Sequence, residues 1–131
     1  MRASPDLSKT SSSMPDRTII ATDSDIRKAI DMDRAISIVR SAFRNHGLSR
    51  VVMPPKIYLH LNKYRGDFRA MPAYISGDEA CGLKWVNVHP LNSRRGLPTV
   101  MAVIILSDPA TGACLAIMDG THITNMRTGA A

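Results

Sequence analysis

The sequence predicts an α+β fold in which N-terminal helices pack on a mostly antiparallel β-meander and a further helix begins near residue 121. Apolar residues recur at helical spacing over residues 32–46, and from residue 51 the pattern changes to alternation and short apolar runs. The segments after residue 56 are joined by short, turn-like connections such as KYRGD, SGDE and DPATG. Short connections join antiparallel strands, whereas parallel strands need long crossovers.

The N-terminal part of the chain predicts an arm, a short strand and two helices. Residues 1–16 are rich in serine and proline and are expected to be a disordered arm. Residues 17–22 (RTIIAT) fit a short strand, and Asp23-Ser24 can cap a helix with the sequence SDIRKAI. Asp31 can cap a longer helix over residues 32–46. The apolar stripe of that helix is interpreted as core or dimer contact: Ala35, Ile36, Val39, Ala42 and Phe43.

Five strands are expected to form the meander. They cover residues 56–61, 68–75, 80–89, 99–106 and 113–118, with a polar loop between the third and fourth. The continuous apolar run TVMAVIIL is typical of a strand that is buried on both faces. After DG at residues 119–120 a helix begins, with Thr121 as a candidate N-cap.

Composition excludes several classes of protein. The 131 residues, 44% of them hydrophobic, suffice for about one domain with a real core. The formal charge of +6 is spread along the chain and accompanied by few aromatic residues, which disfavours a nucleic-acid or membrane partner. The two cysteines show no zinc spacing, so no metal is expected. The absence of a signal-like or membrane-spanning run favours a cytoplasmic location.

Three cations stand among apolar strands and are candidates for binding a small carboxylate. Lys84 shares one face of its strand with Val86 and Val88, and this is costly unless the ammonium meets an anion or snorkels out from an edge strand. Lys56 heads an alternating strand in the same way. Arg127 lies in the last helix with Thr124 and Thr128, as an anion cradle or as a surface arginine.

The segment NVHPLN, residues 87–92, leaves two interpretations open. Asn87, His89 and Asn92 could bind a ligand near the strand end, or could satisfy the backbone of the following loop. A histidine before a proline is more often a structural turn residue than a base.

Four segments together resemble the ornithine cyclodeaminase/mu-crystallin family. They are MPPKIYL, GDFRAMPAYI, the long segment GLKWVNVHPLNSRRGLPTVMAVIILSDPATGACLAIMDG, and ITNMRTGAA. The resemblance runs from about residue 19 to residue 131. It implies an NAD(P)-dependent enzyme of amino or imino acids, commonly a homodimer, in which hydride transfer takes place at Cα of the substrate.

The resemblance also implies how the chain is organised. Residues 17–120 are expected to be an incomplete substrate-binding and dimerisation domain. Residues 121–131 are expected to be the start of a truncated hinge helix that would lead into a missing Rossmann domain with the NAD or NADP site. On this expectation the chain alone is not a complete enzyme, whereas the implied full-length parent is one.

The resemblance assigns roles to individual residues. Lys84 matches a strand lysine that contacts the substrate carboxylate and polarises the imine, and it is the catalytic candidate. Arg127 matches a carboxylate ligand, and Lys56 stands where many members place an arginine that also binds the carboxylate. Thr128 is suited to the cofactor pyrophosphate, and Thr99 is expected near the nicotinamide.

Arg69 is a departure from the namesake enzymes. It stands where the cyclodeaminases have an acidic residue, two positions before Met71-Pro72. The departure puts ornithine in doubt and points to another amino or imino acid, for instance an acidic one.

Four functions remain open at this point. The parent could be a cyclodeaminase that converts ornithine to proline and ammonia, an amino acid dehydrogenase, or a ketimine or pyrroline-2-carboxylate reductase. It could also be a non-catalytic protein, either a remnant or a protein that binds a small ligand as mu-crystallin-like proteins do.

Overall fold

The computed structural model describes residues 17–131, and the arm expected over residues 1–16 lies outside the described residues. The elements follow one another as β1 (Ile19–Ala21), α1 (Asp23–Ala29), α2 (Met32–Gly47), β2 (Val51–Val52), β3 (Ile57–Leu61), a 3₁₀ turn η1 (Asn62–Tyr64), β4 (Gly66–Ile75), β5 (Ala80–Val88), a second 3₁₀ turn η2 (Pro90–Arg95), β6 (Val100–Ser107), β7 (Cys114–Asp119) and α3 (Thr121–Gly129). The expected α+β class and the meander are confirmed.

One seven-stranded sheet carries the fold. Its order is β1-β7-β6-β5-β4-β2, and β3 pairs with the other part of β4. All pairs are antiparallel except β1 with β7. That parallel edge was not expected from the sequence, and the segment expected to be a loop after β5 forms the turn η2.

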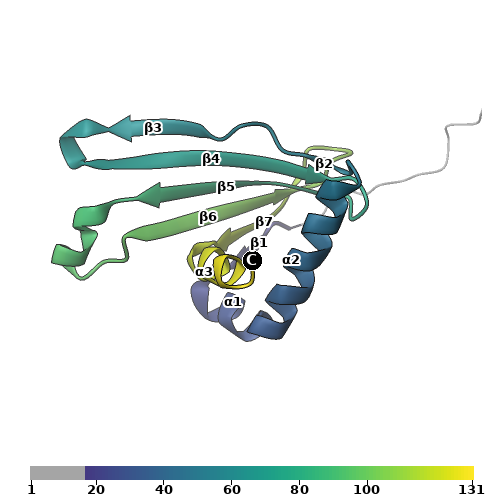
Figure 1. Ribbon diagram of the computed structural model, residues 1–131, viewed down its shortest axis with the longest axis horizontal. Helices are drawn as coiled ribbons and strands as arrows, with labels where there is room; N and C mark the ends of the chain where they lie inside the picture. Colours follow the sequence, from purple (N-terminus) through teal and green to yellow (C-terminus); the bar gives the residue numbers. More distant parts are fainter. Residues whose placement is uncertain (1–16) are drawn as a thin grey trace, which may run out of the picture.

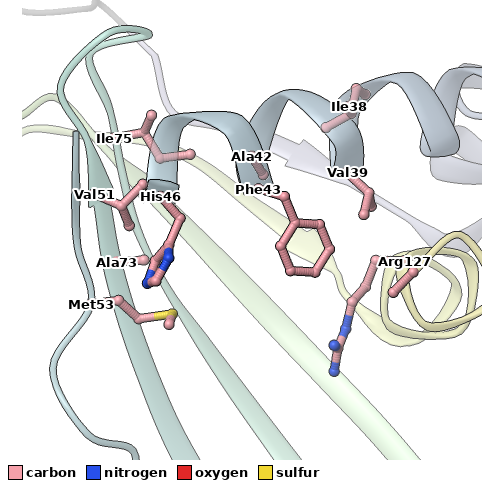
Figure 2. Close-up of a pocket in the computed structure, with 11 residues that line it drawn as sticks. Ile38, Val39, Ala42, Phe43, His46, Val51, Met53, Ala73, Ile75 and Arg127 are labelled. Carbon is pink, nitrogen blue, oxygen red and sulfur yellow. The ribbon is translucent and has the colours of Figure 1, made fainter. Parts of the chain in front are cut away.

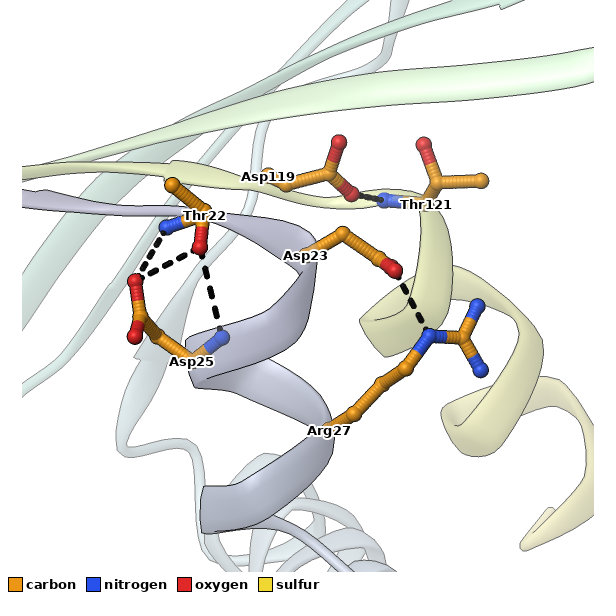
Figure 3. A network of polar contacts seen from close by, with 6 residues as sticks. All are labelled: Thr22, Asp23, Asp25, Arg27, Asp119 and Thr121. Carbon is orange, nitrogen blue, oxygen red and sulfur yellow. Dashed lines mark hydrogen bonds and ion pairs between the residues drawn. The ribbon is translucent and has the colours of Figure 1, made fainter.

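Side-chain caps fix the starts of two helices. Thr22 Oγ1 accepts a hydrogen bond from Asp25 N, and the Asp25 carboxylate accepts one from Thr22 N, which is a capping box (Figure 3). The cap of α1 is therefore Thr22, and the expectation for Asp23-Ser24 was one or two residues late. Asp31 caps α2 as expected, through a 2.8 Å bond from Arg34 N.

Helix α3 begins differently from the expectation. Its N-cap is Gly120, and Thr121 is the first helical residue. Asp119 Oδ1 accepts a hydrogen bond from Thr121 N (Figure 3). Thr121 Oγ1 accepts one from Ala102 N in β6. These bonds connect the start of α3 to the sheet.

All three helices lie on one side of the sheet, which we call the helix face (Figure 1). Val86 and Ala102 are paired neighbours on this face, and both are at least nine-tenths buried. Ala116 of β7 is also buried, as are Ile26 of α1 and Ala35 of α2. No helix within residues 17–131 has the length and apolarity needed to cross a membrane.

The other side of the sheet, the open face, presents apolar side chains to solvent. Ile57 and Leu59 of β3 are 68% and 51% exposed, and Trp85 stacks on Phe68 at a centroid distance of 5.1 Å. Val103 of β6 is 43% exposed. The expectation that residues 99–106 are buried on both faces is therefore wrong for this structure, because no described segment covers the open face.

Candidate functional site

The first member of the site is Lys84, in the middle of the sheet. It pairs with Met71 of β4 on one side and with Ile104 of β6 on the other. Because side chains alternate along a strand, Lys84 points to the helix face together with Val86. The sequence alternation over residues 83–88 predicted this placement, and the strand is central rather than an edge.

Lys56 and Arg127 reach the same region from other parts of the chain. Lys56 directly precedes β3, and its Nζ lies 5.7 Å from the centroid of the Tyr58 ring. Arg127 extends from the last turns of α3 (Figure 2). Both cations lie close enough to Lys84 for their charges to act on it. The three residues predicted to bind a carboxylate therefore form one cluster, which we call the cation cluster.

The electrostatics of the cluster favour an anion. Burial lowers the pKa of the Lys84 ammonium, and the positive charges of Arg127 and Lys56 lower that pKa further. The negative charge of a bound carboxylate would compensate the positive charges of Arg127 and Lys56 and would raise the pKa of Lys84 again. In the free protein the three cations therefore repel one another, and a small anion bound among them would reduce this repulsion. Arg127 can bind a carboxylate with two parallel hydrogen bonds.

A largely apolar pocket lies beside Arg127. Its volume is about 470 Å³, and His46 and Arg127 are its two residues with polar side chains. Figure 2 shows Phe43 and Val39 of α2 facing the pocket from one side and Met53 and Ala73 from the other. The stripe of α2 was expected to be core or dimer contact, and Ala35 of the stripe is core. Val39, Ala42 and Phe43 instead line this pocket, and Phe43 is 65% exposed, while a contact of the stripe with a partner stays a prediction.

Arg69 also lies on the helix face, and sequence reasoning treated it only as a departure from a pattern. It pairs with Tyr58 of β3 and Val86 of β5. Its guanidinium binds Asp67 through two hydrogen bonds, with Nε 2.7 Å from Oδ1 and an amino nitrogen 3.1 Å from Oδ2. That bond lowers the pKa of the Asp67 carboxyl. Alternation along residues 67–71 was the signal that could have placed Asp67 and Arg69 on this face.

The charge of Arg69 is therefore largely engaged. Its guanidinium carbon lies 5.1 Å from the Tyr58 ring, so this ring has Lys56 and Arg69 as cationic neighbours. An acidic substrate side chain would have to compete with Asp67 for Arg69. A second ammonium on a substrate would have to compete with Arg69 for Asp67.

Thr99 and Thr128, the two residues expected to contact a dinucleotide, lie in different elements, Thr99 just before β6 and Thr128 in α3. Thr99 is five residues along the chain from Ile104, the partner of Lys84, which is about 17 Å at the rise of a β-strand. The Thr128 hydroxyl donates a 2.7 Å hydrogen bond to the Thr124 carbonyl within α3. Neither position tests a contact with a dinucleotide, and both roles stay predictions.

The polar residues of segment 87–92 divide between the two interpretations. Asn87 Oδ1 accepts a hydrogen bond from Met101 N, and Asn92 Nδ2 donates one to the Pro98 carbonyl. Both asparagines therefore satisfy loop or strand backbone.

In the described part of the chain, no group of three or more His, Cys, Asp or Glu side chains has an arrangement that could hold a metal ion.

Comparison with known proteins gives one consistent answer. The sequence profile of the ornithine cyclodeaminase/mu-crystallin family matches residues 16–131. Alanine dehydrogenase of Archaeoglobus fulgidus is 52% identical over 114 residues, which cover 87% of this chain and 34% of that protein.

Two solved structures support the same relationship. An archaeal alanine dehydrogenase dimer with bound NAD superposes with a TM-score of 0.80 at 50% identity, over 86% of this chain and 34% of that one. The Delta(1)-pyrroline-2-carboxylate reductase of Thermococcus litoralis, in complex with NADH and L-proline, has a TM-score of 0.85 at 40% identity, over 86% and 35% of the two chains. The chain thus spans about a third of the length of these relatives.

Proposed function

The chain belongs to the ornithine cyclodeaminase/mu-crystallin family, and from that membership we propose that residues 17–131 form the substrate-binding and dimerisation part of an NAD(P)-dependent enzyme of amino or imino acids. The observation that carries the proposal is the convergence of Lys56, Lys84 and Arg127 on the helix face, where the charges of the other two lower the pKa of Lys84. A site with this electrostatic character binds a small carboxylate.

Each cation has a distinct task in this proposal. Arg127 and Lys56 hold the substrate carboxylate, and the planar guanidinium of Arg127 fixes its orientation. Lys84 contacts the carboxylate and polarises the imine, and its lowered pKa suits it to share a proton with the substrate nitrogen. A nicotinamide, when bound, accepts or supplies a hydride at Cα. We assign Thr99 and Thr128 as this chain's own contacts to that cofactor.

The geometry favours an uncharged substrate side chain over an acidic or a basic one. Arg69, which had pointed to an acidic substrate, is held by two bonds to Asp67. The same bonds occupy Asp67, which otherwise could bind a second ammonium such as that of ornithine. A dehydrogenase of a neutral amino acid or a reductase of a cyclic imino acid therefore fits better than a cyclodeaminase.

The open face is the surface that we assign to a homodimer. Ile57, Leu59 and Val103 expose apolar surface there, and an exposed apolar sheet face is typical of a protein contact. A molar mass of one chain at every concentration in light scattering would refute this assignment.

Carboxylate binding can be tested on the chain itself. We expect L-proline and L-alanine to shift the amide NMR signals around Lys84 and Arg127, and prolinamide, which lacks the carboxylate, to leave them in place. Replacing Arg127 with glutamine should weaken binding about tenfold or more, since it removes a charge-assisted contact. The matched control is Arg40→Gln, because Arg40 is exposed on α2 and lines none of the pockets described here.

Two results would contradict the proposal. One is equal binding of the carboxylate and the amide. The other is equal weakening by Arg127→Gln and Arg40→Gln, which would mean that the overall positive charge of the chain attracts the ligand rather than a built site.

A further inference from the structure

A second pocket lies at the end of the sheet, away from the cation cluster. It sits between the two 3₁₀ turns, η1 after β3 and η2 after β5, and its volume is about 240 Å³. Pairing of Asp67 with Val88 holds the two turns together. Val88 is four residues along β5 from Lys84, about 13 Å. The six residues that line the pocket are Lys63, Tyr64, His89, Leu91, Asn92 and Arg95.

The lining of this pocket is cationic and carries no carboxylate. Lys63 comes from η1 and Arg95 from η2, so the two charges approach from separate loops. The acidic residue nearest along the chain, Asp67, lines a different pocket, and its oxygens accept the hydrogen bonds of Arg69. Its charge also acts on His89, and the bonds from Arg69 offset that negative charge. Among the described residues, neither Lys63 nor Arg95 forms an ion pair. Lys63 Nζ lies 5.3 Å from the centroid of the Tyr64 ring, a contact that leaves its charge without a carboxylate partner. An external anion can therefore reach both positive charges.

His89 adds a hydrogen-bond donor to the same pocket. Asn87 Oδ1 is fixed as an acceptor by Met101 N, so Asn87 Nδ2 is the atom that faces His89 Nδ1, at 2.8 Å. Nδ2 can only donate, so His89 Nδ1 must accept, and the ring proton lies on Nε2. Within residues 17–131, Nε2 has no hydrogen-bond partner. A chain of hydrogen bonds that starts at the backbone of β6 thus leaves His89 as a donor.

The His89 ring is also held in place by packing. It lies against Gly66, where an added Cβ would come within 2.6 Å of Cδ2 and 2.8 Å of Nε2. The Phe68 ring meets it edge to face at a centroid distance of 5.4 Å. The donor is therefore preorganised, which lowers the entropic cost of binding a small ligand.

From these observations we propose that the pocket between η1 and η2 binds a phosphate group. A phosphate offers several acceptor oxygens and a double negative charge, which match the ammonium of Lys63, the guanidinium of Arg95 and the Nε2–H of His89. The group could come from free phosphate or from the terminal phosphate of a phosphomonoester such as a nucleotide. The proposal does not depend on the function proposed for the cation cluster.

The test is a titration of the 131-residue chain with inorganic phosphate and with AMP, followed by amide NMR at constant ionic strength. We expect saturable shifts at Lys63, His89 and Arg95 with a Kd on the order of 1 mM. Arg95→Gln and Lys63→Gln should each weaken binding about tenfold. Arg94→Gln is the matched control, because Arg94 lies in the same turn but does not line the pocket, and it should change Kd less than about twofold.

Each outcome is decisive. Tighter binding of AMP than of phosphate would support the proposal and identify a phosphomonoester as the source, and equal binding would support it with free phosphate. Equal loss from Arg94→Gln and Arg95→Gln would overturn it, as would the lack of saturation by about 20 mM phosphate. Lys63→Gln, in the other loop, keeps the test valid if Arg95→Gln does not fold.

Discussion

Replacing Lys84 with methionine should stabilise the free protein while it abolishes most of the carboxylate binding. Methionine has a similar length and is apolar, and its neighbours across the sheet are Met71 and Ile104. The change removes an ammonium that the free protein disfavours: burial lowers its pKa, and the two neighbouring cations lower it further. Lysine at this position therefore destabilises the free fold, and that cost depends on its charge.

The magnitude follows from Coulomb's law with a high dielectric constant, since Lys84 is only half-buried. For two unit charges one Debye length apart, about 8 Å, an effective dielectric of about 40 to 80 gives a repulsion of about 0.5 to 1 kcal/mol. Two such neighbours, screened by physiological salt, leave about 0.5 kcal/mol. Relief of the desolvation of the ammonium, the larger cause of the lowered pKa, adds a similar amount, which gives about 1 kcal/mol in total. In a domain of this size, a gain of that order raises Tm by about 4 °C.

The pH dependence has a defined sign. The folded pKa of Lys84 is below its ordinary value of 10.5, so the unfolded chain holds more protons between these two pKa values. The stability of the parent protein therefore rises with pH in that window. The advantage of Lys84→Met should be full at neutral pH and should disappear as pH rises through the folded pKa of Lys84 towards 10.5.

Urea unfolding at two pH values and two salt concentrations measures this effect. The control is Lys63→Met, since Lys63 lies at the end of the sheet and outside the cation cluster, and we expect it to change stability by less than about 0.5 kcal/mol. A Lys84→Met protein that is no more stable than the parent at pH 7 would refute the electrostatic reasoning. So would a gain that is the same at high salt and high pH.

The remaining predictions concern the framework of the site and are measured by thermal or urea unfolding. Gly82→Ala should cost about 1–3 kcal/mol, because its Cβ would lie 2.7 Å from the backbone oxygen of Ile105. Gly47→Ala is the matched change, and it should gain about 0.5–1 kcal/mol because its Cβ meets no atom within 4 Å and the position is helical. Thr22→Ala should cost about 1 kcal/mol through loss of the capping box, whereas Thr22→Ser should be close to neutral. An equal effect of the two threonine substitutions would show that the cap does not stabilise α1.

Local patterns were sufficient to predict the elements of the site, because strand alternation is a property of consecutive residues. Alternation over residues 83–88 placed Lys84 on the same face as Val86, and the register confirms this. The position of Asp31 before a helical stripe gave the cap of α2. The same rule places Asp67 and Arg69 on one face, so the sequence also carries this part of the site.

Other features could not follow from local patterns. The three residues of β1 carry no periodicity that selects β7 as a parallel partner. Phe43 fits the apolar stripe of α2, but whether a stripe packs or lines a pocket depends on how the helix crosses the sheet. Lys84 lies in a central strand because β5 stands between β6 and β4 in the sheet. Alternation within one strand does not predict the order of the strands.

The geometry of the cation cluster depends on one apolar residue of β6. Ile104 is the cross-strand neighbour of Lys84, and it also contacts Gly120, where an added Cβ would lie 2.9 Å from Ile104 Cγ1. Gly120 is the N-cap of α3, the helix that carries Arg127. The close approach of Gly120 to the sheet therefore fixes where α3 begins relative to β6. Lys84 lies in a central strand, and the charge of Arg127 acts on it. Apolar residues at these two positions would make the free protein more stable. An anion bound between Lys84 and Arg127 would offset the cost of the two charges, so the packing and charges of this chain by themselves favour a carboxylate ligand.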